Sequence, residues 1–163
     1  MRWEWGESRR DGALTHSMKF YRILVAVDGG DADEDAIQLA CRLTKETKGK
    51  VFVVNVIEVK RSLPLNAQLQ EDAGQGERIL RHAQDCADQR DCKIETDLLQ
   101  AREPGPAIVT EVLEKQIDLV LMGMSYRTKF GHFEIGDTVP YVLKNAPCRV
   151  MVLRQPLESE AAK

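Results

Sequence analysis

The residues best suited to bind a charged ligand lie at positions 123–138, in the stretch GMSYRTKFGHFEIGDT. Glycines lack a Cβ and let a phosphate approach the backbone, and a helix beginning near Asp137 would direct its first N–H groups at an anion. Arg127, Lys129 and His132 add positive charge to the same stretch. A solvated surface loop could have the same composition, so these residues alone leave both interpretations open.

The stretch DGGDAD at residues 28–33 combines a turn with acidic residues that continue into Glu34 and Asp35. Carboxylates at the start of a helix stabilise it through its dipole. We therefore expect a solvated capping cluster rather than a metal site, and one that opposes a polyphosphate unless Mg²⁺ intervenes. The stretch also resembles the SGGxDS loop of ATP pyrophosphatases. Asp28 and Asp33 replace the two serines of that loop, which argues against this activity.

The cysteines and histidines do not have the spacing of a metal site. Cys41, Cys86, Cys92 and Cys148 form no CxxC pair, and the three histidines are scattered. We expect no zinc site and four reduced thiols in a cytoplasmic protein. The alternative is a disulfide between Cys86 and Cys92, which requires the intervening helix to end between them. There is no GxSxG and no cysteine with an evident base, so we expect no enzyme.

The composition is that of a single globular domain. The chain has 163 residues, of which 43% are hydrophobic and 30% charged, so it can bury a core rather than remain disordered. Its 23 basic and 26 acidic residues give a net charge of −3, which argues against general nucleic-acid binding. No apolar run is long enough to span a membrane. We expect residues 1–17 to be a flexible extension without the apolar core of a signal peptide, and 156–163 to be a polar tail.

Five apolar runs alternate with helical segments and predict a three-layer α/β sandwich with a parallel sheet. The expected strands are 21–28, 50–59, 93–99, 119–123 and 149–153. The expected helices lie between Asp31 and Gly49, over 71–90, from Pro104 onward and over 137–145. Asp31 and Glu34 have capping-box spacing, and Ile108, Val109, Val112 and Leu113 form the apolar face of the third helix. A ligand is expected beyond the carboxyl ends of the strands.

Four segments carry a resemblance to a known family: ILVAVDGG, VVNVIEV, DLVLMG and VPYVLKNAPCRVMVL. From Met18 to Arg154 the chain resembles the universal stress protein family, which implies one such domain over residues 18–155. The resemblance implies a five-stranded parallel sheet of order 3-2-1-4-5, with the fold of the adenine nucleotide alpha hydrolases. It also implies a homodimer through the last strand, formed by Arg149, Val150, Met151, Val152 and Leu153.

Members of this family that bind ATP carry G-x-x-G, nine further residues and then G-[S/T]. This chain has Gly123, Tyr126, Gly136 and Asp137 at the four positions, so the second glycine and the hydroxyl are lost. The adenosine end matches better, at Asp28, Val56 and Met122. By resemblance, the nucleotide-binding residues are Asp28, Val56, Met122, Gly123, Arg127, Gly136, Asp137 and Thr138.

The resemblance implies a regulatory, non-enzymatic stress protein with a degenerate adenine-nucleotide cleft. No cofactor is certain: ATP or AMP are the candidate ligands, with Mg²⁺ if a triphosphate binds. The alternative is a sensor of AMP or a cyclic dinucleotide that regulates a transporter. That alternative is based on RSLPLNAQLQED at residues 61–72 and REPGPAIV, which resemble stress-protein domains appended to some membrane transporters.

Overall fold

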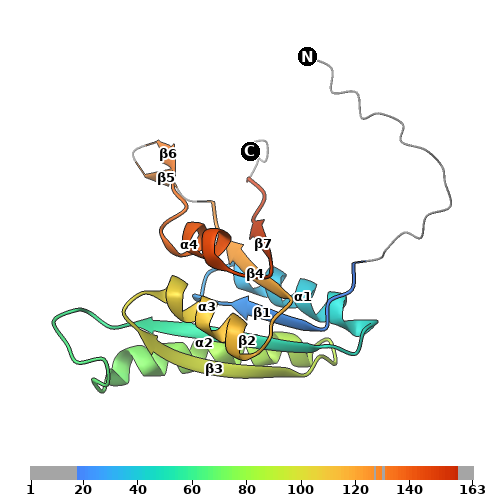
Figure 1. The fold of residues 1–163 in the computed structure, drawn as a ribbon, viewed down its shortest axis with the longest axis horizontal. Helices are drawn as coiled ribbons and strands as arrows, with labels where there is room; N and C mark the ends of the chain where they lie inside the picture. Colours follow the sequence, from blue (N-terminus) through green and yellow to red (C-terminus); the bar gives the residue numbers. More distant parts are fainter. Residues whose placement is uncertain (1–17, 127, 130, 158–163) are drawn as a thin grey trace, which may run out of the picture.

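A computed structural model describes residues 18–126, 128–129 and 131–157 of the chain, so the extension predicted over 1–17 and most of the predicted tail lie outside the described residues. Five parallel strands form one sheet of order β3-β2-β1-β4-β7 (Figure 1). They are β1 (Arg22–Ala26), β2 (Lys50–Glu58), β3 (Ile94–Ala101), β4 (Leu119–Met124) and β7 (Arg149–Arg154). Counted within the sheet, this is the predicted order 3-2-1-4-5, which is confirmed.

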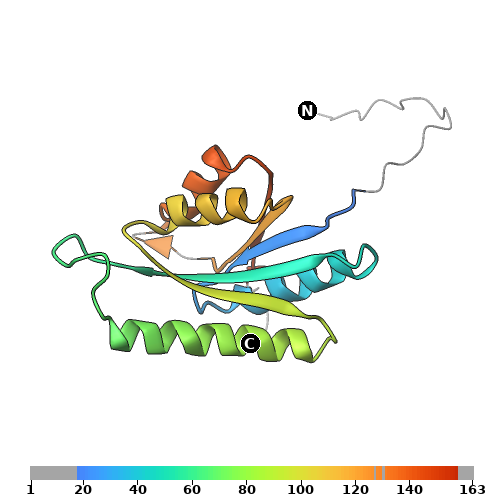
Figure 2. The ribbon, with the colours of Figure 1, turned by 60° about the horizontal axis from the view of Figure 1, so that its bottom comes forward.

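Helices cover both faces of the sheet, as the alternating pattern predicts. The helices are α1 (Ala32–Lys45), α2 (Gln70–Asp88), α3 (Pro104–Glu114) and α4 (Thr138–Asn145). Figure 2 shows α1 and α2 on one side of the sheet and α3 and α4 on the other. Among the described residues, no helix combines the length and the apolar character needed to cross a membrane.

The central strands carry near-continuous apolar runs, such as 23–25 of β1 and 51–54 of β2, and both faces of these runs are buried. Ile23 and Val25 of β1 pack into the core under α1 and α2, whereas Leu24 between them packs into the core under α3. All three side chains are fully buried. Each helix contributes one apolar stripe to these cores, but Leu113 is 61% exposed, so its predicted place on the buried face of α3 is wrong. Ile108 and Val112 carry that face.

The capping box predicted at the start of α1 is also wrong. Asp31 occupies the N-cap position, but its backbone is helical and its side chain makes no capping hydrogen bond. The N-cap residue of a capping box has extended backbone, which places its side chain over the first turn. The carboxylate that serves the β1–α1 turn is instead that of Asp33, which accepts the backbone N–H groups of Asp28 and Gly29.

A short antiparallel hairpin that the sequence did not predict interrupts the connection from β4 to α4. It consists of β5 (Thr128–Lys129) and β6 (His132–Phe133), joined through Gly131, whose φ is +77°. The rings of Tyr126 and Phe133 stack across its base, with centroids 5.2 Å apart and planes 13° apart. In Figure 1 the hairpin projects beyond α4.

The expectation of four reduced thiols is wrong, and so is the alternative pairing of Cys86 with Cys92. A disulfide joins Cys41 of α1 to Cys92, just before β3, with their Cα atoms 5.8 Å apart. Helix α2 ends at Asp88 and the chain then turns toward α1, which brings Cys92 to Cys41 and leaves Cys86 within the helix. Cys86 and Cys148 are free, and burial raises the pKa of both thiols.

Candidate functional site

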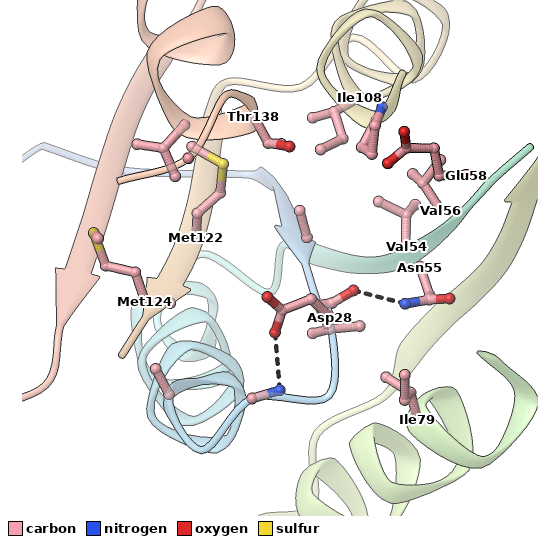
Figure 3. Close-up of a pocket in the computed structure, with 18 of the residues that line it drawn as sticks. Asp28, Val54, Asn55, Val56, Glu58, Ile79, Ile108, Met122, Met124 and Thr138 are labelled. Carbon is pink, nitrogen blue, oxygen red and sulfur yellow. Dashed lines mark hydrogen bonds between the residues drawn. The ribbon is translucent and has the colours of Figure 1, made fainter. Parts of the chain in front are cut away.

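A cleft of about 500 Å³ opens beyond the carboxyl ends of β1, β2 and β4, as expected for a doubly wound sheet (Figure 3). Its lining brings together seven of the eight residues predicted to bind a nucleotide, namely Asp28, Val56, Met122, Gly123, Gly136, Asp137 and Thr138. Arg127, the eighth, lies outside the described residues. Segments more than a hundred positions apart in the sequence therefore meet at one edge of the sheet.

Two carboxylates fix the loop between β1 and α1, where Asp28 enters the cleft. Asp28 accepts the backbone N–H of Gly30 through its own Oδ1 at 2.8 Å, which closes a tight turn (Figure 3). Gly29 has a φ of +87°, a conformation that favours glycine. Oδ2 of Asp33 accepts the N–H groups of Gly29 at 2.7 Å and of Asp28 at 3.1 Å. These bonds hold the Asp28 side chain at the mouth of the cleft.

Asp33 has an unusual protonation equilibrium for an acid in a helix. Only 5% of its surface is exposed, and burial raises the pKa of its carboxyl from 3.8 to about 6. The negative charge of Asp28 adds to this rise of the pKa, and the N–H groups of Gly29, Asp28 and Gly30 oppose it. The loop beneath the cleft is therefore held by a carboxyl that gains a proton in mildly acidic solution.

The floor of the cleft depends on Asn55, which the sequence analysis missed. Asn55 is buried in β2 and donates its Nδ2 hydrogen to the carbonyl oxygen of Val27 at 2.9 Å (Figure 3). This bond ties the carboxyl end of β2 to that of β1. Gly76 of α2 lies against the same amide, and a Cβ there would collide with Leu98 and lie 2.9 Å from Oδ1 of Asn55. A polar residue within the apolar run VVNVIEV was the available signal, since buried amides need partners.

Two glycines of the predicted phosphate motif have different physical roles. A Cβ on Gly123 would lie 2.7 Å from the carbonyl carbon of Ala32, so this glycine lets α1 pack against β4. Gly136 has a φ of +74° and no neighbour that a Cβ would meet, so it serves the turn into α4. Asp137 follows at the N-cap position of α4, exposed and without a capping hydrogen bond from its side chain. Thr138 begins the helix.

The described lining of the cleft combines apolar walls with negative charge. Figure 3 shows Val54, Val56, Ile79, Ile108 and Met122 around the cavity. The charged side chains among the described lining residues are all acidic: Asp28, Glu58, Asp72, Glu134 and Asp137. This described lining suits a flat apolar ring beside hydrogen-bonding groups, and each of its carboxylates would repel a phosphate placed next to it.

The comparisons with known proteins agree with this architecture. The family model described as "Universal stress protein family" matches residues 19–154. The chain belongs to the universal stress protein family. A universal stress protein of Methanocaldococcus jannaschii is 27% identical over 146 residues, which cover 84% of this chain and 84% of that protein. The resemblance stated from the sequence is therefore confirmed.

Solved structures of family members share the fold. A universal stress protein from Archaeoglobus fulgidus superposes with a TM-score of 0.70 at 22% identity, covering 81% of this chain and 97% of that one. The structure of the Archaeoglobus fulgidus protein in complex with dAMP gives a TM-score of 0.66, also at 22% identity, over 83% of this chain and 98% of that one. At this identity the likeness shows the fold.

The strand predicted to form a dimer lies at an edge of the sheet. Within the described residues β7 pairs with β4 alone, from Arg149 opposite Leu119 to Arg154 opposite Met124. Arg149 is exposed, whereas the next four residues are partly buried. They are Val150, Met151, Val152 and Leu153. The outer edge of β7 thus offers backbone hydrogen-bonding groups beside an apolar surface.

Proposed function

We propose that this chain is a regulatory protein that binds an adenine nucleotide of low charge in the cleft and catalyses no reaction on it. The observation that carries the proposal is the pairing of apolar walls with an acidic lining. Two like charges 4 Å apart repel by about 4 kcal/mol at an effective dielectric of 20, so each additional phosphate charge costs affinity. A monophosphate is then favoured over a triphosphate.

The side chains support distinct roles in this binding. Val56, Ile108 and Met122 would contact the base. The Oδ2 atom of Asp28 carries none of the described hydrogen bonds and would accept one from a ribose hydroxyl. The first N–H groups of α4, with Thr138, would meet a single phosphate. The dAMP complex of the Archaeoglobus fulgidus protein supports this class of ligand.

Calorimetric titration with adenosine, AMP and ATP, each with and without Mg²⁺, tests the proposal. We expect AMP to bind more tightly than free ATP, and Mg²⁺ to recover part of the ATP affinity by neutralising charge. Asp28→Asn should weaken AMP binding by about tenfold or more, because it alters a charged acceptor. Asp85→Asn, an exposed carboxylate of α2 outside the cleft, is the control. Tighter binding of free ATP than of AMP would contradict the proposal.

We also propose that two copies associate through the outer edge of β7 and that the protein acts in the cytoplasm. Sedimentation at tens of micromolar should show a dimer, and Val152→Lys should shift it toward monomer, because a lysine on an edge strand opposes pairing. Leu157→Lys, which alters a side chain already 57% exposed, is the matched control. Regulation of a transporter, and a cyclic dinucleotide as ligand, stay predictions from the sequence.

A further inference from the structure

Three side chains capable of binding a metal converge where α1 crosses α2, outside the nucleotide cleft. They are Glu34 in the first turn of α1, and His82 and Cys86 of α2. One ligand atom from each lies within 4.8 Å of the other two. His82 and Cys86 are four residues apart on a helix and so lie on one face, directed at the first turn of α1.

The separation of the histidine and the cysteine fits a shared metal ion. Nε2 of His82 lies 3.7 Å from Sγ of Cys86. Tetrahedral zinc with a bond of about 2.3 Å to sulfur and about 2.0–2.1 Å to nitrogen sets those two ligand atoms about 3.6 Å apart. The two atoms are therefore already placed as one zinc ion would hold them. A direct hydrogen bond between thiol and imidazole would have a similar length, so the distance alone does not choose between the two.

Glu34 is what distinguishes a metal site from a simple thiol–imidazole pair. Its carboxylate adds a third, negatively charged ligand type from the other helix, and Gln38 orients it by donating its Nε2 hydrogen to Oε1 at 2.9 Å. Such an outer-shell hydrogen bond is what usually fixes a ligating carboxylate.

The surroundings leave one coordination position open. Cys86 is buried, while Glu34 and His82 are exposed. A hollow beside the cluster is lined by Glu34, Gly30, Arg78 and His82 among others, and would admit the ion and a fourth ligand from solvent. Three protein ligands with an open fourth position are typical of reactive or exchangeable zinc rather than of a closed structural site.

We propose that Glu34, His82 and Cys86 bind a divalent transition-metal ion, with zinc as the ion that best suits one thiolate, one imidazole and one carboxylate. No zinc site was expected from the sequence because the cysteines form no CxxC pair and the histidines are scattered. Glu34 is separated in the sequence from His82 and Cys86 by the whole of β2. The bound ion would fasten α1 to α2 beside the loop of Gly29 and Gly30, which is shared with the nucleotide cleft. This proposal is independent of the proposed nucleotide.

Titration with Co²⁺, followed by displacement with Zn²⁺, tests the site. The protein is kept in oxygen-free buffer without reductant, so that the Cys86 thiol survives and the Cys41–Cys92 disulfide stays closed. We expect one equivalent of Co²⁺ to produce a thiolate charge-transfer band and the visible bands of tetrahedral cobalt, both abolished by Zn²⁺. A band without sulfur character, or no saturable binding, would overturn the proposal.

Substitutions then assign the ligands. Cys86→Ser should abolish the charge-transfer band, and His82→Gln or Glu34→Gln should weaken Zn²⁺ binding at least as much as the ~10–100-fold that outer-shell changes cause. His82 and Glu34 are exposed, so their replacement leaves the core packed even if Cys86→Ser disturbs it. The controls are Cys148→Ser, the other free thiol, and His132→Gln. Unchanged Zn²⁺ affinity in both His82→Gln and Glu34→Gln would overturn the assignment.

Discussion

The buried carboxylate of Asp33 accepts the backbone N–H of Gly29 at 2.7 Å. Through this bond an acid in the first turn of α1 holds the loop from which Asp28 reaches the nucleotide cleft. This bond requires an acceptor oxygen but not a negative charge. A substitution can therefore remove the charge of Asp33 and still keep the hydrogen bond that holds the loop. Asparagine keeps one acceptor oxygen of the same shape and has no charge to bury.

Asp33→Asn should make the protein more stable at neutral pH and leave it nearly unchanged at pH 4. The folded pKa of Asp33, about 6, exceeds its usual 3.8. The stability that protonation confers is therefore fully present below pH 3.8 and is lost as the pH rises through 6. The loss amounts to about 3 kcal/mol, which the asparagine variant would not suffer. Urea unfolding of both proteins between pH 4 and 7 measures it.

The comparison with Asp33→Asn isolates a single group, because every other acid is common to both proteins. Asp35→Asn removes an exposed charge from the same turn and is the matched control. If the difference in unfolding free energy between wild type and Asp33→Asn is the same at pH 4 and pH 7, the raised pKa is not a property of the folded protein.

Replacing either of two glycines of α2 by alanine should change the stability of the protein, but in opposite directions. A Cβ on Gly74 would meet only the end of Arg78, at 3.6 Å, so Gly74→Ala should stabilise the helix by about 0.5–1 kcal/mol. Gly76→Ala would press on Leu98 and on the amide of Asn55 and should destabilise by about 1–3 kcal/mol. Thermal unfolding of the two variants measures the sign of each change in stability. A stabilising Gly76→Ala would mean that α2 is free to move away from the sheet.

The disulfide predicts a thiol count that depends on the redox state. Unfolded without reductant, the protein should present two thiols, Cys86 and Cys148, and four after reduction. In the chain-entropy description, a bridge that closes a loop of 51 residues raises the free energy of the unfolded chain by about 4 kcal/mol, because it removes conformational entropy. The double variant Cys41→Ala with Cys92→Ala should therefore lower the free energy of unfolding by a similar amount under oxidising conditions. Four thiols without reductant would show that the bridge does not form. A reducing cytoplasm would favour the open form.

The layers could be predicted because a parallel strand buried on both faces leaves a near-continuous apolar run, such as residues 23–25. The strand order was implied by the resemblance to a known family. The meeting of Asp28 and Gly123 followed from the rule that ligands bind beyond the carboxyl ends of strands. Thr138 was added by the family resemblance. These inferences need only local patterns and a known topology.

The remaining features depend on distances between segments that no local pattern encodes. Asp33 looks like a solvated acid of a first turn, yet the loop folds over it and buries it. Cys92 lies nearer in sequence to Cys86 than to Cys41, but the turn after α2 reverses that order in space. Asn55 needed the course of β1 beside it before its partner could be named.

Replacing Asp137 should improve ATP binding without changing adenosine binding. Asp137 lies at the N-cap of α4, and its side chain makes no capping hydrogen bond to that helix, so removing its charge leaves the fold intact. Because Asp137 is exposed, solvent and salt screen the repulsion between its carboxylate and the phosphates of ATP. We therefore expect Asp137→Ser to strengthen the binding of free ATP by only about tenfold, or about 1.4 kcal/mol. Tyr126→Gly is studied as a separate variant, because it also removes the stacking of the Tyr126 ring on Phe133.

Calorimetry at two salt concentrations measures the effect of Asp137→Ser, since an electrostatic gain must shrink as salt rises. Adenosine carries no phosphate, so its affinity serves as the internal control for cleft geometry. Equal gains for adenosine and ATP would mean that the serine reshapes the cleft rather than relieving repulsion. No gain for either would place the barrier to triphosphate binding elsewhere among the acidic lining residues, with Glu134 the next to replace.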